Sequence, residues 1–227
     1  MTLPLVLLLG MNCSPALWDA VRPLLPGGVP VLDREVTEPT LDAAVAALLD
    51  DLPDRFDLAG LSLGGIVAMA LVRVAPERVR RLALLSTNAR PPTEPQLAAW
   101  DATVAQLDTG ASARDLQADL LPLLLSEATA EQSAATLRMA DQVGAAVLAN
   151  QLRCQATRVD ERPGLSAVRS PTLVLAAEND ALCPVERHAE IAGAISGARL
   201  VVLRGSGHLS PLQAPDAVAR ALASWLA

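Results

Sequence analysis

Residues Gly60-Leu61-Ser62-Leu63-Gly64 form a G-x-S-x-G pentapeptide at the junction of two sequence patterns. Residues 56–61 read as a short buried strand, and residues 63–74 have the apolar spacing of a helix. A serine between a strand and a helix sits in a sharp, strained turn, with its hydroxyl exposed above the helix N-terminus. The glycines on either side keep side chains out of this crowded turn. The pentapeptide therefore predicts that Ser62 is an exposed nucleophile.

Strand-like apolar runs alternate with helical patterns along most of the chain. This alternation predicts an α/β fold, in which helices cover both faces of a mostly parallel sheet. Several of the runs are continuously apolar, as is typical of strands buried on both faces. The six expected strands are residues 4–9, 29–33, 56–61, 81–86, 172–177 and 199–203. The helices expected beside them are residues 16–25, 41–52, 63–74, 185–195 and 214–226.

The interval 89–169 breaks this alternation because it contains only helical periodicity. It is bounded by the proline-bearing segments Arg90-Pro91-Pro92 and Arg162-Pro163-Gly164, and its expected helices are residues 94–107, 113–125 and 131–157. A crossover between two parallel strands needs only about a dozen residues. We therefore expect residues 89–169 to form a helical cap on a core made of residues 1–88 and 170–227. Ordinary covering helices are the alternative interpretation.

Composition excludes several classes of function. With 52% hydrophobic residues among 227, the chain can bury a large core, and its net charge of −7 argues against a nucleic-acid partner. The sequence has no lysine and no tyrosine, which excludes Schiff-base chemistry, a P-loop lysine and a Ser-Lys pair. Three cysteines without C-x-x-C spacing fit a reduced, cytoplasmic protein without a zinc site. No stretch approaches the roughly 20 apolar residues of a membrane span. We also expect the protein to need neither a metal nor a cofactor.

A serine hydroxyl needs a neighbouring base, which a third group must orient. The chain has two histidines. His188 lies inside a helical pattern, and we expect it to be exposed at the surface. His208 follows the last expected strand, and loops at the carboxyl ends of parallel strands hold the sites of such sheets. His208 is thus the expected base. Asp180, in the loop after strand 172–177, is the expected acid, with Glu178 as a weaker candidate.

On these residues the chain resembles the α/β-hydrolase superfamily over nearly its whole length, and their order of Ser, Asp and His is that of the superfamily. Within it, the chain is similar to small carboxylesterases of the pimeloyl-carrier-protein methyl esterase type. Beyond the pentapeptide and Gly65, the resemblance is carried by Ser170-Pro171-Thr172-Leu173-Val174-Leu175 before Asp180 and Pro184, by Gly207-His208 before Pro215, and by the terminal Trp225-Leu226.

The resemblance also implies an oxyanion hole. Gly10-Met11-Asn12-Cys13, with Trp18 shortly after, resembles the oxyanion loop, so the backbone amides of Met11 and Leu63 would bind the oxyanion. Many relatives have His-Gly where this chain has Leu9-Gly10, but the donors are backbone groups and need no histidine. Relatives also carry a strand hairpin before this point, so we expect a trimmed sheet of about six strands.

The resemblance implies a serine hydrolase that cleaves the ester or thioester of a small acyl substrate through an acyl-enzyme on Ser62. The expected cap is rich in leucine and alanine, which favours an aliphatic acyl group, and Trp100 is its only aromatic residue. Asn12 and Trp100 are the expected substrate contacts. Two alternatives stay open: a carbon–carbon bond hydrolase, lyase or cyclase with the same triad, and a non-catalytic ligand-binding protein of the same fold.

Overall fold

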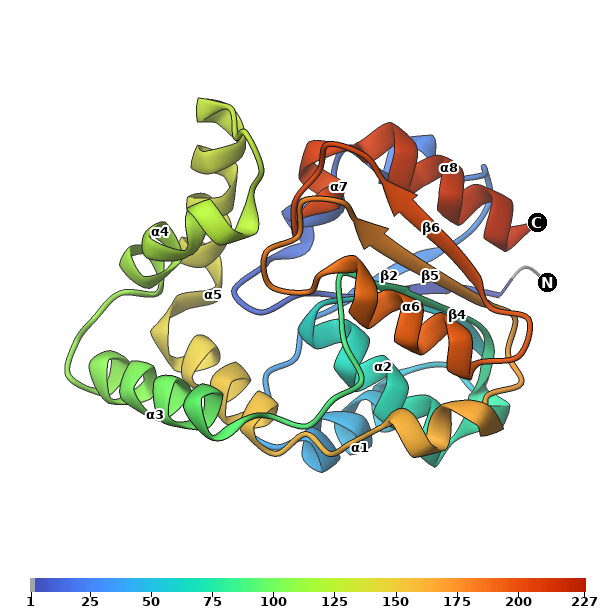
Figure 1. Ribbon diagram of the computed structural model, residues 1–227, viewed down its shortest axis with the longest axis horizontal. Coiled ribbons are helices and arrows are strands. Elements are labelled where there is room, and N and C mark those ends of the chain that lie inside the picture. The colour runs from blue at the N-terminus through green and yellow to red at the C-terminus, as the bar shows by residue number, and fades with distance from the viewer. Residues whose placement is uncertain (1–2) are drawn as a thin grey trace.

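The computed structural model describes residues 3–227, so residues 1 and 2 of the expected core lie outside the described residues. Its six strands form a single parallel sheet in the order β2-β1-β3-β4-β5-β6 (Figure 1). The strands are β1 (Leu5–Leu8), β2 (Val31–Arg34), β3 (Phe56–Leu61), β4 (Val79–Leu85), β5 (Thr172–Ala177) and β6 (Arg199–Leu203). The predicted fold class, a six-stranded parallel sheet flanked by helices, is confirmed.

Side chains of the strands alternate between two apolar layers, because successive residues of a strand point to opposite faces. Val6 and Leu8 of β1 pack in the layer that contains α1 (Leu41–Asp51), α2 (Leu63–Val74) and α6 (Val185–Ala194). Leu5 and Leu7 pack in the opposite layer, which contains α8 (Pro215–Leu226). All four of these side chains are completely buried. Each contributes about 1.5–3 kcal/mol of hydrophobic stabilisation.

The prediction of one helix over residues 16–25 is wrong. The structure has two short 3-10 helices there, η1 (Pro15–Trp18) and η2 (Arg22–Leu24). Pro23 lies inside η2 and has no backbone N–H to donate to the preceding turn, so it disfavours a continuous α-helix over residues 16–25. The remaining short elements are η3 (Pro76–Arg78), η4 (Arg162–Ala167) and α7 (Ser210–Gln213).

Three longer helices follow β4 and precede β5: α3 (Glu94–Asp108), α4 (Ala113–Leu124) and α5 (Ala130–Ala156). Figure 1 shows them grouped beyond the carboxyl ends of β5 and β6, apart from the helices that cover the sheet. Helices α3 and α5 each begin with a capping box, in which a threonine and a glutamine satisfy each other's backbone N–H groups. Gly144 bends α5 with a φ of 76°, a left-handed conformation that glycine adopts without strain.

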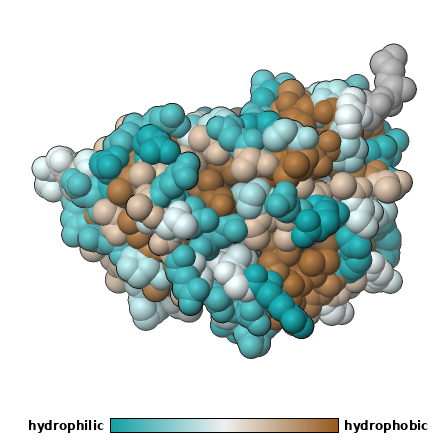
Figure 2. Space-filling view, turned by 90° about the horizontal axis from the view of Figure 1, so that it is seen from above, coloured by the Kyte–Doolittle hydropathy of each residue, from teal (hydrophilic) through white to brown (hydrophobic). Residues whose placement is uncertain are grey.

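The face shown in Figure 2 mixes hydrophilic and hydrophobic residues, and a broad hydrophobic area lies below and to the right of its centre. Large exposed hydrophobic side chains among the described residues come from positions far apart in the chain, such as Val74, Leu123 and Val202. Within residues 3–227, no helix combines the length and the apolar character that crossing a membrane requires.

Candidate active site

Ser62 joins β3 to α2 and has a strained backbone, with φ 55° and ψ −114°. A positive φ at a residue with a side chain costs about 1–3 kcal/mol and persists only where surrounding contacts hold it. Here the Ser62 N–H donates to Leu85 O at 2.9 Å, and the Ser62 carbonyl accepts the Thr87 hydroxyl at 2.9 Å. Contacts with the neighbouring strand β4 and the residues just after it thus fix the turn that presents the Ser62 hydroxyl.

The glycines of the pentapeptide are required by close approaches of the backbone. A Cβ atom on Gly60 would lie 2.2 Å from Gly64 O, and one on Gly64 would lie 2.4 Å from Leu8 O. Both distances are far below any contact that real Cβ atoms make. Any side chain at either position would force apart the strand and the helix that hold Ser62.

His208 and Asp180 lie on the loops that follow β6 and β5, and they form a close pair. Nδ1 of His208 is 2.9 Å from each carboxylate oxygen of Asp180. Oδ1 of Asp180 also accepts the N–H groups of Leu182 at 2.9 Å and Cys183 at 2.8 Å. Burial alone would raise the pKa of Asp180, but His208 and the two N–H groups together lower it below its usual value. Asp180 is therefore an ionised acceptor at neutral pH, and Nε2 is left as the free nitrogen of the His208 ring.

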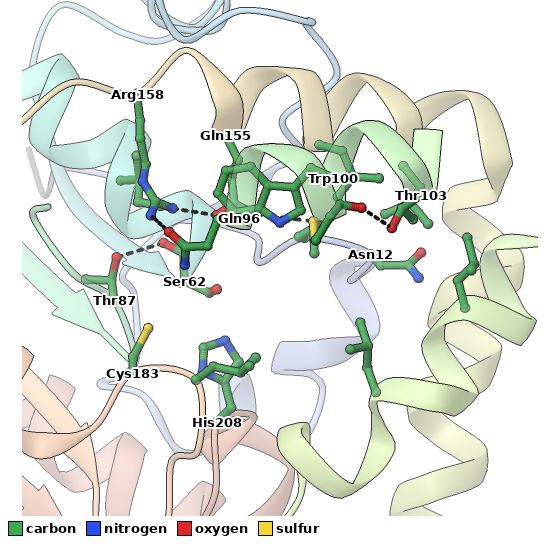
Figure 3. Close-up of a pocket in the computed structure, with 18 of the residues that line it drawn as sticks. Asn12, Ser62, Thr87, Gln96, Trp100, Thr103, Gln155, Arg158, Cys183 and His208 are labelled. Atoms are coloured by element: carbon green, nitrogen blue, oxygen red, sulfur yellow. Dashed lines mark hydrogen bonds between the residues drawn. The ribbon is translucent and has the colours of Figure 1, made fainter. Parts of the chain in front are cut away.

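Ser62 and His208 line the same cavity, whose volume is about 290 Å³ (Figure 3). Among the described residues, none makes a hydrogen bond to Ser62 Oγ, and catalytic hydrogen bonds often tighten only when substrate is bound. The structure thus brings together Ser62, His208 and Asp180. Glu178 is placed elsewhere, because its exposed carboxylate accepts the Gly205 N–H at 3.0 Å.

Met11 in the loop after β1 lines the cavity, and Leu63 directly follows Ser62. The N–H groups of Met11 and Leu63 make no hydrogen bond within residues 3–227, and Leu63 is the first residue of α2, where helix N–H groups have no partner in the helix. The neighbouring Asn12 N–H is already used, since it donates to Gln151 Oε1 at 2.8 Å. Asn12 Nδ2 donates to Ala113 O at 3.1 Å and so ties the loop to α4. Asn12 therefore anchors the loop, and it also lines the cavity.

Residues of the helical segment 94–156 complete the cavity wall. Leu116, Leu120, Leu148 and Leu152 make this wall largely apolar. Trp100 also lines it, as a predicted substrate contact should. Reasoning from the sequence missed a polar group in the same wall, formed by Gln96, Gln155 and Arg158. These residues carry no local motif, and only their contacts in the folded chain reveal them.

The prediction that His188 is exposed is wrong. Its side chain is completely buried on the inner face of α6, and its Nε2 accepts the Thr87 N–H at 3.0 Å. Burial lowers the pKa of His188, so the ring is neutral and can accept this bond. His188 thereby positions Thr87, whose hydroxyl bonds the Ser62 carbonyl.

Asp180, Cys183 and His208 present potential metal ligands within 4.8 Å of one another. Burial, followed by the nearby Asp180 charge, raises the pKa of Cys183 to about 12. A metal binds the thiolate, which this environment disfavours, and Asp180 and His208 are already bonded to each other. The donor set therefore suits a protonated, tightly packed thiol better than a metal ion.

Comparisons with known proteins agree with this geometry. The model of the alpha/beta hydrolase family matches residues 5–221. The chain is 32% identical to the pimeloyl-(acyl-carrier protein) methyl ester esterase of Aromatoleum aromaticum, with 93% of each chain covered. It is 28% identical to the enzyme of the same name from Nitrosomonas europaea, over 81% of this chain and 76% of the relative. Its fold matches a thermophilic esterase from Thermogutta terrifontis with a TM-score of 0.90 at 25% identity, covering 100% of this chain and 90% of that one. This chain belongs to the alpha/beta hydrolase family.

Proposed function

We propose that this protein is a serine hydrolase that cleaves an ester or thioester of a small acyl compound through an acyl-enzyme on Ser62. The observation that carries the proposal is the His208–Asp180 pair, which lies in the same cavity as a serine with strained backbone geometry. Two relatives that are named methyl ester esterases support the reaction class.

In the proposed mechanism, Nε2 of His208 takes the proton of Ser62 as Oγ attacks the substrate carbonyl. Asp180 keeps the other ring nitrogen protonated and stabilises the imidazolium. The N–H groups of Met11 and Leu63 hydrogen-bond the oxyanion of the tetrahedral intermediate. His208 then gives its proton to the leaving alcohol or thiol as the acyl-enzyme forms. Water, deprotonated by His208, attacks the acyl-enzyme, and the acid leaves as Ser62 regains its proton.

The size and lining of the cavity favour a small, mainly aliphatic acyl group. Ligand sites span about 300–1,000 Å³, so a cavity of about 290 Å³ lies at the lower end. Four leucines of α4 and α5 supply much of its apolar wall. We also propose that residues 89–169 act as a cap over a core of residues 1–88 and 170–227, because α3, α4 and α5 all contribute to the wall.

Hydrolysis of p-nitrophenyl acetate, butyrate and octanoate tests the proposal. Ser62→Ala should reduce turnover to background, and Asp180→Asn should lower kcat by about 10⁴-fold. Glu178→Gln is the matched control, because it changes the other carboxylate of the same loop, and it should stay within about twofold of wild type. Equal rates for wild type and Ser62→Ala would contradict ester hydrolysis and favour a lyase, a cyclase or a ligand-binding role.

A further inference from the structure

Arg158 is an unusual residue in the wall of the cavity. It follows Thr157, the C-cap of α5, and only 6% of it is exposed. Among the described residues that line the cavity, there is no other arginine and no aspartate or glutamate. Figure 3 shows Arg158 beside Gln96 and Gln155, with Ser62 drawn between it and His208 in this view. A single buried positive charge thus lines the cavity that also holds Ser62.

The partners of Arg158 are all neutral. Its guanidinium donates to Arg90 O at 3.1 Å, Gln155 Oε1 at 2.9 Å and Gln96 Oε1 at 3.2 Å. Its carbon lies 5.1 Å from the centre of the Trp100 ring. A guanidinium has five N–H donors, so two of them have no partner among the described residues. Arg158 therefore has donors to spare on a surface that lines the cavity.

Two other arginines, unlike Arg158, form ion pairs with carboxylates. Arg90 forms an ion pair with Glu190 at 2.9 Å, and Arg162 pairs with Asp160 at 2.6 Å. Arg158 is more deeply buried than either, yet within residues 3–227 no carboxylate lies within ion-pair distance of it. Burial lowers the pKa of Arg158, but a guanidinium stays charged at neutral pH.

A buried charge without a counter-ion is costly, although two features reduce that cost here. The carbonyl end of α5 is the negative end of its helix dipole, and the Trp100 ring face attracts a cation. Neither supplies a full negative charge. An anion in the cavity would supply one, and a carboxylate matches the planar fork of arginine with two parallel hydrogen bonds. A single guanidinium also matches one negative charge better than the two of a phosphate.

We infer that Arg158 binds a carboxylate carried by the substrate, so that the cavity selects half-esters of small dicarboxylic acids over neutral esters of equal length. This inference rests on the proposed function, because it names the substrate class of the same site. The carboxylate would lie against Arg158 and Gln96, and the ester carbonyl would lie at Ser62. The leucines of α4 and α5 would contact the methylene groups between them.

The test compares monomethyl succinate, glutarate and adipate with the neutral methyl esters of butyrate, pentanoate and hexanoate, by pH-stat at pH 7.5. For at least one chain length, wild type should favour the half-ester by about 10- to 100-fold in kcat/KM, the range expected for a charge-assisted hydrogen bond. Arg158→Met should lose this preference, mainly through a higher KM for the half-esters, so the readout is the ratio of kcat/KM for half-ester and neutral ester measured on the same variant. Arg158→Gln serves as a second neutral variant if the methionine variant does not fold.

Arg138→Met is the matched control, because Arg138 is exposed on α5, the helix that precedes Arg158, and makes no ion pair within the described part of the chain. It should retain the preference of wild type. Equal kcat/KM for half-esters and neutral esters in wild type would overturn the inference while leaving the proposed function intact. A preference that survives in both Arg158 variants would also overturn it.

If wild type hydrolyses neither these methyl esters nor the p-nitrophenyl esters, the proposed function fails, and binding then decides the inference separately. Glutarate and adipate would be titrated calorimetrically into wild type and into Arg158→Gln. Binding that weakens at least tenfold in the variant would support a carboxylate site at Arg158. Absent binding, or equal binding by both proteins, would overturn it.

Discussion

Replacement of Gly64 by alanine tests how tightly the strand and the helix around Ser62 are packed. The added Cβ would lie 2.4 Å from Leu8 O and 2.7 Å from Leu8 C, and ordinary contact begins at 3.4 Å. Strand β1 and the start of α2 must therefore separate by about 1 Å. Both neighbours are backbone atoms, which cannot rotate away as the end of a side chain can.

Overpacking of this kind costs about 1–3 kcal/mol, and we expect about 3 kcal/mol because only backbone can yield. For a chain of this size, 1 kcal/mol shifts Tm by about 2–4 °C, so Gly64→Ala should melt roughly 6–12 °C below wild type. The shift would also displace the Leu63 N–H, so ester turnover should fall together with stability.

Thermal unfolding followed by circular dichroism measures this effect, with Gly193→Ala as the control. Gly193 lies inside α6, and a Cβ there would meet nothing within 4 Å. The same substitution should therefore stabilise the protein by about 0.5–1 kcal/mol. If Gly64→Ala gives no soluble protein while Gly193→Ala does, that result also agrees with tight packing at Gly64. A Gly64→Ala protein that melts within 2 °C of wild type and keeps its ester turnover would refute it.

Three further predictions follow from buried polar groups. Burial lowers the pKa of His188 in the folded protein, so as the pH falls this histidine is protonated more readily in the unfolded chain than in the folded one. The contribution of His188 to the free energy of unfolding is therefore complete above about pH 6.5 and is lost as the pH falls below that value. Urea unfolding at pH 7.5 and pH 5 should show this loss in wild type and a smaller loss in His188→Asn; equal losses would contradict it. Burial raises the pKa of all three cysteine thiols to about 12. Ellman's reagent should therefore label no thiol in the native protein at pH 8 and three in denaturant. A thiol that is labelled in the native protein would contradict this prediction. Gln151 Oε1 accepts the Asn12 N–H, and Gln151 Nε2 donates to Val36 O. Gln151→Leu should therefore lower the free energy of unfolding by about 1–3 kcal/mol for each backbone group left unpaired. It should also slow ester turnover, because Met11 is adjacent to Asn12. The exposed Gln142→Leu on the same helix should do neither, and similar behaviour of the two variants would refute the role of Gln151.

The sheet could be predicted because its signals are local. Each buried strand is a short apolar run, and six of them in alternation with helices favour one parallel sheet. The carboxyl ends of parallel strands meet at one edge, so Ser62, Asp180 and His208, which follow β3, β5 and β6, could be expected to converge. The structure shows this proximity, and their catalytic roles stay a proposal.

The polar wall of the cavity could not be predicted, because it depends on contacts between distant segments. All 18 basic residues are arginines, and nothing in the local sequence separates Arg158 from the others. Its partners Gln96 and Arg90 lie 62 and 68 residues away in the chain. Only the packing of α5 against α3 and the loop after β4 brings them together.

The burial of His188 could have been found from the helical period. Glu186 and Glu190 are four residues apart and share one face of α6, while His188 is two residues from each and lies on the opposite face. Ile191, three residues after His188, is completely buried on that same face. The angular position of His188 was therefore a better guide than the charge of its neighbours.

The cavity wall comes from two different parts of the sequence. Ser62, His208 and the loop after β1 follow strands of the sheet, whereas Gln96, Trp100, Arg158 and the leucines of α4 and α5 come from one uninterrupted stretch, residues 96–158. Exchange of this one stretch would replace a large part of the cavity wall in a single step while leaving Ser62, Asp180 and His208 in place. Gln151 and Ala113, which hold Asn12, belong to the same stretch, so a replacement would have to keep these two contacts. Within that limit, the wall could be varied as one contiguous segment.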